Sequence, residues 1–351
     1  MVMNNRKKLP FLFLSALLPF FFSCSLRTLA VDSLADMLAG SGGTVFTGDE
    51  DPELVGEALP FALKLYESLL SASPENSELL LTAGTGFISY ANVYVHTPAD
   101  MLPREEYRKQ REMRNRAKAL YLRGRDYVLR GLEVRHPGFL EALGRKDFEK
   151  AFLKFSEEDV PYLYWAAAGW LSAVGFDVLD TELMITVPSA FSLAVEALSL
   201  DESWGQGSIH ELFISVYGSV PEYLLFRPEV PEGGDTLADY LKGYYGLNLG
   251  SGELSVEEKG RFHFERALDL AQGEKSSPYL SYALAFARKR VDPETLLGLP
   301  EEYISLLEQA LEVDPKASEA NVLVNTVNQR KARWLLENLD IYFILEADDE
   351  W

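Results

Sequence analysis

The sequence has one cysteine, Cys24, and four histidines, and these numbers limit its chemistry. A single cysteine cannot form an internal disulfide. The four histidines lie far apart, with no H-x-x-x-H pair and no cysteine nearby. His210-Glu211 begins like the zinc-binding helix of a metalloprotease, but Ile214 stands where the second histidine is required. We therefore predict no metal site and no cofactor.

Sequence motifs of common enzyme classes are also missing. The chain contains no phosphate-binding loop and no G-x-S-x-G, and the run from Gly205 to His210 lacks the last glycine of a dinucleotide-binding loop. Carboxylate pairs arise by chance among 54 acidic residues, so a hydrolase with two close carboxylates in an open cleft stays as a minor alternative. We expect a protein that is not an enzyme.

Positive charge is in short supply, since 33 Lys and Arg face 54 Asp and Glu and the net charge is −21. Such a field repels nucleic acid, so we expect no nucleic-acid partner. The segment Arg104–Arg130 is the exception, with ten basic residues against four acidic ones. It is either a solvated helix face that neutralises acids elsewhere, or a docking patch that includes Lys109, Arg111 and Arg114. Such a patch would bind a partner protein or anionic lipid headgroups.

No run after residue 24 is long and apolar enough to suggest a membrane span. The longest uncharged run, Val160–Phe176, begins with Pro161 and carries polar residues and glycines, which favours a buried core helix. Residues 1–23 differ, because three basic residues precede an apolar run from Leu9 to Phe22 that is shorter than the ~20 residues of a transmembrane helix. This pattern predicts a signal peptide.

Ser23-Cys24 resembles the cleavage site of a bacterial lipoprotein, in which Cys24 becomes the lipid-attachment residue. The predicted location is then the periplasm, with the chain anchored to a bacterial membrane. The alternative is an ordinary signal peptide with an incidental cysteine. Residues 24–51 read as a tether with a short amphipathic helix at 25–38, followed by a glycine-rich stretch. Its apolar positions are Leu26, Leu29, Leu34, Met37 and Leu38.

From residue 52 to 347 helical periodicity dominates, and residues 348–351 form an acidic tail. In Tyr303–Ala320 an apolar stripe of three- and four-residue spacing ends at Asp314-Pro315, and proline disfavours helix at the residue before it. A helix that ends in A-L-x-x-D-P and restarts at once is typical of the second half of a tetratricopeptide (TPR) repeat. Glu78–Val95 is a further predicted helix, and Ala83-Gly84 would let a partner helix approach closely.

Four other stretches repeat this pattern: Pro60–Pro74, Ala117–Pro137, Ala190–Asp201 and Arg261–Leu270. Equivalent positions are separated by 63, 65, 70 and 43 residues, and none of these steps is the ideal ~34. We therefore predict an all-α fold, a degenerate TPR-like solenoid of helical hairpins with insertions. A generic helical bundle is the alternative.

The segment Trp204–Phe213 is the predicted site. Gly205 and Gly207 would shape a helix entrance whose backbone N–H groups face a cavity, and His210, Phe213 and Tyr217 would share one helix face. The alternative is that Phe213 and Tyr217 belong to the core and that His210 is a hydrogen-bonded histidine. Two tryptophans lie on an earlier helix. Trp165 matches a structural repeat position, whereas Trp170 is expected to be freer and to line a groove for an apolar ligand.

With the lipoprotein start included, the chain resembles the TatT family, TPR lipoproteins associated with tripartite ATP-independent periplasmic (TRAP) transporters. The segments that carry the resemblance are Ser23-Cys24, Asp51–Asn76, Ala117–Tyr127, Tyr164–Trp170, Trp204–Phe213 and Pro231–Asp235. The resemblance implies an all-α protein that forms a homotrimer, pairs with the periplasmic solute-binding subunit, and has an apolar pore or groove.

The expected function is a lipid-anchored component of a TRAP-type uptake system. It would bind the solute-binding protein and a small apolar or amphipathic organic ligand, with Trp170, His210, Phe213 and Tyr217 as ligand-binding residues. The alternative is a structural adaptor in an envelope assembly without a small-molecule ligand.

Overall fold

The computed structural model describes residues 45–176, 180–226, 236–250, 252, 254–295 and 297–344. Within these ranges the chain is almost wholly helical, and the β-type pairing they contain is the isolated bridge between Val291 and Gly298. The predicted signal peptide, Cys24, the predicted helix at 25–38, the loop Pro231–Asp235 and the acidic tail lie outside the described residues.

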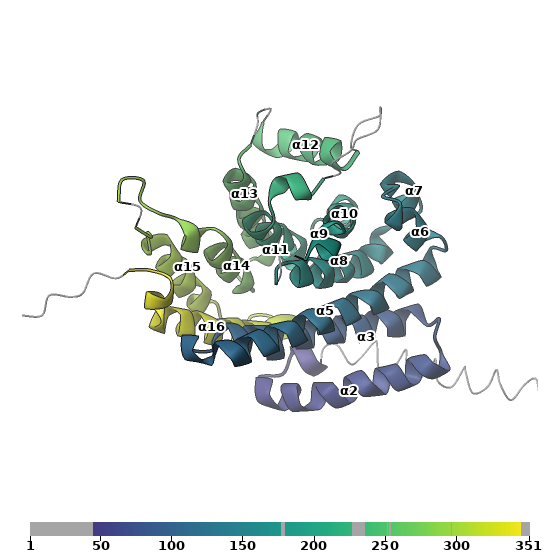
Figure 1. Ribbon diagram of the computed structural model, residues 1–351, viewed down its shortest axis with the longest axis horizontal. Coiled ribbons are helices and arrows are strands. Elements are labelled where there is room, and N and C mark those ends of the chain that lie inside the picture. The colour runs from purple at the N-terminus through teal and green to yellow at the C-terminus, as the bar shows by residue number, and fades with distance from the viewer. Residues whose placement is uncertain are drawn as a thin grey trace, which may run out of the picture.

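Figure 1 shows the helices in chain order. Their bounds are α2 Pro52–Ala72, α3 Ser77–Tyr90, α4 Thr97–Asp100, α5 Tyr107–Arg135, α6 Phe139–Gly144, α7 Phe148–Phe152, α8 Val160–Val174, α9 Thr181–Met184, α10 Val187–Leu200, α11 Trp204–Ser219, α12 Thr236–Leu249, α13 Val256–Ala271, α14 Ser277–Ala285, α15 Glu301–Glu312 and α16 Val322–Glu337. A π-helical segment, Ala91–His96, joins α3 to α4.

The predicted helix ends are confirmed. Helix α15 ends at Glu312, just before Asp314-Pro315, and Leu306, Leu307 and Ala310 are buried. Helix α2 ends ahead of Pro74, and α10 ends where Asp201 begins a turn. Local signals were sufficient here, because a proline or an Asp cap acts on its own neighbours in the chain.

The helices pack in pairs, and the pairs follow one another along the chain. Helix α3 packs with α5, α8 with α10, α11 with α13, and α14 with α15. Contacts of α5 with α8 and of α11 with α14 join successive pairs. The prediction of an all-α, solenoid-like fold is thus confirmed. The core of the described chain has a large cluster from Ile88 to Tyr245, a second one from Ile214 to Phe343, and two smaller ones around α2.

Two apolar segments lie inside this core. Most of α8 is buried, which confirms that Val160–Phe176 supplies a core helix. The stretch Thr181–Leu200, formed by α9 and α10, is the one segment of the described chain long and apolar enough to cross a membrane. Since 67% of its most apolar window is buried in the protein, its composition is explained by core packing.

The first and last helices of the described chain meet. Helix α16 contacts α2, where Val55, Leu59 and Leu323 share a small apolar cluster. Arg330 of α16 pairs with Glu53, and the Lys331 ammonium lies 3.4 Å from the Asp100 carboxylate. The two ends of the described array therefore touch.

The close packing of α3 on α5 depends on two glycines. A Cβ on Gly84 would lie 2.4 Å from the Val128 Cγ2 and 2.7 Å from the Gly124 carbonyl oxygen. The expectation that Ala83-Gly84 allows close approach is confirmed. We predict that Gly84→Ala lowers the free energy of unfolding by about 1–3 kcal/mol through overpacking, measured by urea denaturation.

Gly144→Ala is the control for this substitution, because a Cβ at that helical position meets nothing within 4 Å. Equal stability of the two variants would contradict the assignment of the α3–α5 contact to Gly84.

Candidate functional site

Helix α11 opens with a left-handed turn. Gly205, Gln206 and Gly207 have φ values of 61°, 53° and 85°. A Cβ on Gly207 would lie only 3.0 Å from the Ala267 Cα of α13, so glycine serves both the backbone angle and the close packing. The predicted helix entrance at Gly205 and Gly207 is confirmed.

A lysine from the α13–α14 loop fills this entrance. The Lys275 ammonium donates to the Gly205 carbonyl oxygen at 3.1 Å and to Ser208 Oγ at 2.9 Å, and it pairs with Glu211. Only 5% of Lys275 is exposed. We expected backbone N–H groups facing a cavity. The structure corrects this, because the turn presents carbonyl oxygens and a buried ammonium occupies the position.

Amide side chains tie the same turn to α16. Gln206 Nε2 donates to the Glu274 carboxylate at 2.5 Å, and Asn321 Nδ2 donates to Gln206 Oε1 at 2.7 Å. Asn325 Nδ2 donates to the Glu274 carbonyl oxygen at 2.9 Å. Helices α11 and α16 and the α13–α14 loop therefore meet at one polar junction.

One helical turn further on, α11 supplies the predicted site residues. His210, Phe213 and Tyr217 lie on its inner face with exposures of 0%, 1% and 4%, as the core alternative had it. His210 Nδ1 lies 2.8 Å from His263 Nδ1 of α13, and His263 Nε2 lies 2.7 Å from the Tyr245 hydroxyl of α12. Tyr245 donates in turn to the Tyr217 hydroxyl at 2.9 Å. We call this set, from His210 to Tyr217, the His–Tyr chain.

Burial keeps the His–Tyr chain neutral. It lowers the pKa of His210 from 6.5 to about 4, and it holds the pKa of His263 well below 6.5. Burial also raises the pKa values of Tyr217 and Tyr245 well above 10. The chain is therefore uncharged at neutral pH, and the hydrogen bonds described above join its own members.

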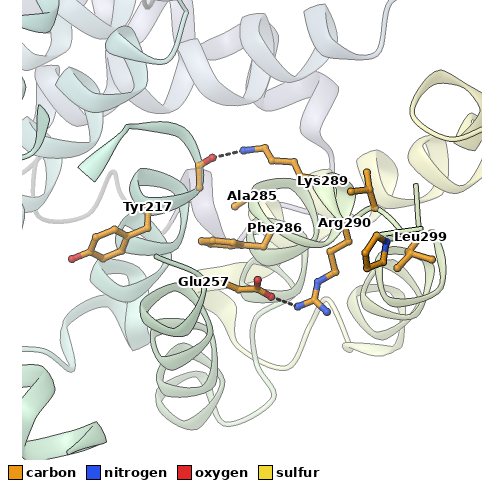
Figure 2. Close-up of a pocket in the computed structure, with 10 residues that line it drawn as sticks. Tyr217, Glu257, Ala285, Phe286, Lys289, Arg290 and Leu299 are labelled. Carbon is orange, nitrogen blue, oxygen red and sulfur yellow. Dashed lines mark hydrogen bonds and ion pairs between the residues drawn. The ribbon is translucent and has the colours of Figure 1, made fainter. Parts of the chain in front are cut away.

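Tyr217 at the end of this chain also borders a pocket of about 560 Å³ (Figure 2). The pocket lies between the C-terminal end of α11, the start of α13 and the segment after α14. Its lining is mixed, with five apolar side chains beside three charged ones. The lining residues are Tyr217, Gly218, Glu257, Ala285, Phe286, Lys289, Arg290, Val291, Pro293 and Leu299.

The two cations of the pocket have different partners. Arg290 pairs with Glu257 and, at 2.8 Å, with the Glu302 carboxylate. Lys289 donates to the Gly218 carbonyl oxygen at the end of α11 (Figure 2). Burial, together with the nearby Arg288 charge, lowers the pKa of Lys289. No carboxylate of the described chain neutralises Lys289, so its charge is available to an anionic group.

The prediction for Trp170 was wrong in its premise. Trp170 is 8% exposed, its Nε1 donates to Thr186 Oγ1 at 2.8 Å, and the Arg125 guanidinium lies 4.7 Å from its ring centroid. Trp165 is the more exposed of the two. Trp170 is therefore buried and has its own hydrogen-bond and cation–π partners. It does not line the pocket beside Tyr217, which we call the Tyr217 pocket.

The basic segment forms most of α5, and many of its charges are paired within the fold. Lys109 pairs with Glu106 at 2.8 Å and Arg114 with Asp100 at 2.9 Å. Arg111 is exposed and pairs with no acid among the described residues. The neutralising interpretation thus accounts for part of the segment, and a docking role for these three residues stays a prediction.

Sequence reasoning missed His263, Tyr245, Lys275 and Lys289. Each comes from an element distant in sequence from α11, and none stands in a motif. Only the histidine at 263 gave a signal, as a polar residue within the apolar stripe of its helix. The described residues contain no group of three His, Cys, Asp or Glu side chains that could hold a metal ion.

Comparison with known proteins places this geometry in context. Residues 48–225 and 238–343 match the model of the TAtT family, described as the TRAP transporter T-component. An uncharacterized protein of Treponema pallidum (strain Nichols) is 29% identical over 337 residues, which cover 92% of this chain and 93% of that protein.

The ammonium of Lys275 gives a first prediction. Lys275→Met should lower the free energy of unfolding by about 3–5 kcal/mol, because it leaves the largely buried Glu211 carboxylate without its cation and removes a donor from the turn carbonyls. Adding Glu211→Gln should restore part of the loss. Lys154→Met, at an exposed position, is the control. In urea denaturation, a loss no larger than that of Lys154→Met would contradict the assigned role.

The buried histidines predict a pH dependence of stability. The folded pKa of His210 lies below its unfolded value, so the unfolded state takes up a proton first, and stability falls as pH drops below about 6.5. Between about pH 7 and about pH 5 the loss through His210 should be about 2 kcal/mol. His210→Gln should flatten this slope in urea denaturation at the two pH values. An unchanged slope would contradict the assignment.

Proposed function

Because this chain belongs to the TAtT family of TRAP transporter T-components, we propose that it is the envelope partner of a TRAP solute-binding subunit and that it holds a small organic ligand on its way to or from that subunit. Membership makes it a component of a bacterial cell-envelope transport system. In the finer proposal the chain is periplasmic, lipid-anchored through Cys24, and assembles as a homotrimer. It binds and hands over its ligand without bond chemistry.

The observation that carries the ligand part is the Tyr217 pocket. Its apolar walls at Phe286, Val291 and Leu299 would bind hydrocarbon by burial, worth ~25 cal/mol per Å² of apolar surface removed from water. The Lys289 ammonium would orient a polar or anionic end, whereas the Tyr217 hydroxyl points away from the pocket toward Tyr245 (Figure 2). The arrangement fits an amphipathic organic molecule with one polar end.

A feature of the interior favours the alternative of a structural adaptor. His210 and Phe213, two of the residues predicted to touch ligand, are buried by neighbouring side chains. The Phe213 and His263 rings stack with their centroids 4.6 Å apart. An adaptor would need only the outer surfaces, such as the exposed part of α5. The two functions differ in whether the pocket binds anything.

A binding experiment separates the two functions. The probe is 1-anilinonaphthalene-8-sulfonate, an apolar molecule with one anionic group, and binding is followed by its fluorescence. Leu299→Asp should weaken binding at least about tenfold, because it places a negative charge in the apolar wall of the pocket. Leu153→Asp, at a 74% exposed leucine of the segment after α7, is the control. Equal binding of the probe by both variants would contradict the ligand-binding function and favour the structural adaptor.

The partner half of the proposal has its own measurement. Native mass spectrometry of the chain from Ser25, alone and with a TRAP solute-binding protein, should show a trimer and a complex. A monomer that ignores the binding protein would contradict the transport proposal.

A further inference from the structure

Helix α2 carries apolar residues on two faces. One face is buried against α3 and α16 through Val55, Leu59 and Leu63. The second face lies beside the first, and its residues follow one another at three- and four-residue steps. It is most open around Leu54 and Phe61, while Leu69 packs against the core cluster shared with α3. We call it the outer stripe of α2, and it comprises Leu54, Ala58, Phe61, Leu65, Leu69 and Ala72.

The outer stripe is open to solvent. Leu54 is 57% exposed and Phe61 is 76% exposed, while Leu65 and Leu69 are partly buried. In Figure 1, α2 lies at the lower edge of the molecule, with no described helix beyond it. The end of a stacked helical array normally presents a polar outer face, because an apolar one is insoluble. We therefore expect another apolar surface to pack against the outer stripe of α2.

The pairing of the other helices indicates that a helix would pack against the outer stripe of α2. Helices α3 and α5, α8 and α10, α11 and α13, and α14 and α15 form pairs in which the second helix ends at a proline, an acidic cap or a loop. Helix α2 ends in the same way, at Ala72 before Pro74, so it is a second helix. Its first helix would have to come from the chain before Val45, outside the described residues.

The sequence before Pro52 contains one suitable segment. Residues 25–38 carry an apolar stripe at helical spacing, from Leu26 through Leu29 and Leu34 to Leu38. Thirteen residues, 39–51, separate this segment from α2, and Gly40, Gly42 and Gly43 among them allow the chain to reverse. The described chain begins at Val45. The next residue, Phe46, packs against the apolar cluster that contains Val55 and Leu59.

We propose that residues 25–38 dock as a helix on the outer stripe of α2 and complete the first helical pair of the array. With Cys24 directly before this segment, docking holds the helical body within a few residues of the N-terminal cysteine. The lipid anchor would then carry the body at a fixed distance from the membrane rather than on a long tether.

Disulfide trapping tests this docking in the chain from residue 24. Cys24→Ser makes the chain free of cysteine, since Cys24 is the only one. Ser33→Cys, on the predicted docking helix, is then combined with Ala58→Cys or with Ser68→Cys on α2. The matched control pairs Ser33→Cys with Ser305→Cys, an exposed serine of α15.

On mild oxidation we expect a disulfide within one chain for at least one of the two α2 positions and none for Ser305→Cys. Disulfides between chains would show that a second copy covers the stripe and would overturn the proposal. Disulfides at neither α2 position would also overturn it.

Thiol labelling gives an independent readout. The Ser33→Cys thiol should react with N-ethylmaleimide about tenfold more slowly than in the same chain carrying Phe61→Asp, because docking protects it. Tyr223→Asp, which replaces another 76% exposed aromatic residue, should leave the slow rate unchanged. Equal rates in all three chains, with Phe61-dependent binding to phosphatidylcholine vesicles, would assign the stripe to the membrane and overturn the proposal.

Discussion

The fold depends on one buried ammonium. In the left-handed turn from Gly205 to Gly207, the carbonyl oxygens of Gly205 and Gln206 face the Lys275 ammonium, and buried carbonyls without donors are costly. Lys275 satisfies them while its charge is balanced by Glu211. Because Gln206 in the same turn is bonded to Glu274 and Asn321, the start of α11 is fixed relative to α13 and α16. The direction of α11, and with it the position of Tyr217 at the pocket, follows from this junction.

What could be predicted from the sequence is what local chemistry decides. Pro74, Asp201 and Pro315 end helices through their immediate neighbours, and Gly205 and Gly207 mark a turn because no other residue adopts those angles as readily. The all-α, solenoid-like fold follows from such signals. The environment of Trp170 could not be predicted, because the Arg125 guanidinium that covers it lies on another helix.

The candidate site was predictable in part for the same reason. Helical spacing put His210, Phe213 and Tyr217 on one face, and they do share one. The partners that decide what this face does, His263 and Tyr245, come from two later helices, and sequence spacing carries no information about their registry. Two of the three residues are consequently enclosed, and only Tyr217 reaches the pocket. The positions of Lys289 and of the apolar residues near it depend on where α14 ends, and no sequence motif predicted that end.

The contact of α16 with α2 has a consequence for how this protein folds. Arg330 and Glu53 are 277 residues apart in sequence, so this contact raises the contact order of a fold that is otherwise built from neighbouring helices. The helical pairs can pack while the chain is being synthesised, but the contact between α2 and α16 can form only after the last helix is made. A chain cut short before α16 would keep most of its pairs and still expose Val55 and Leu59, a surface that quality-control proteases can recognise.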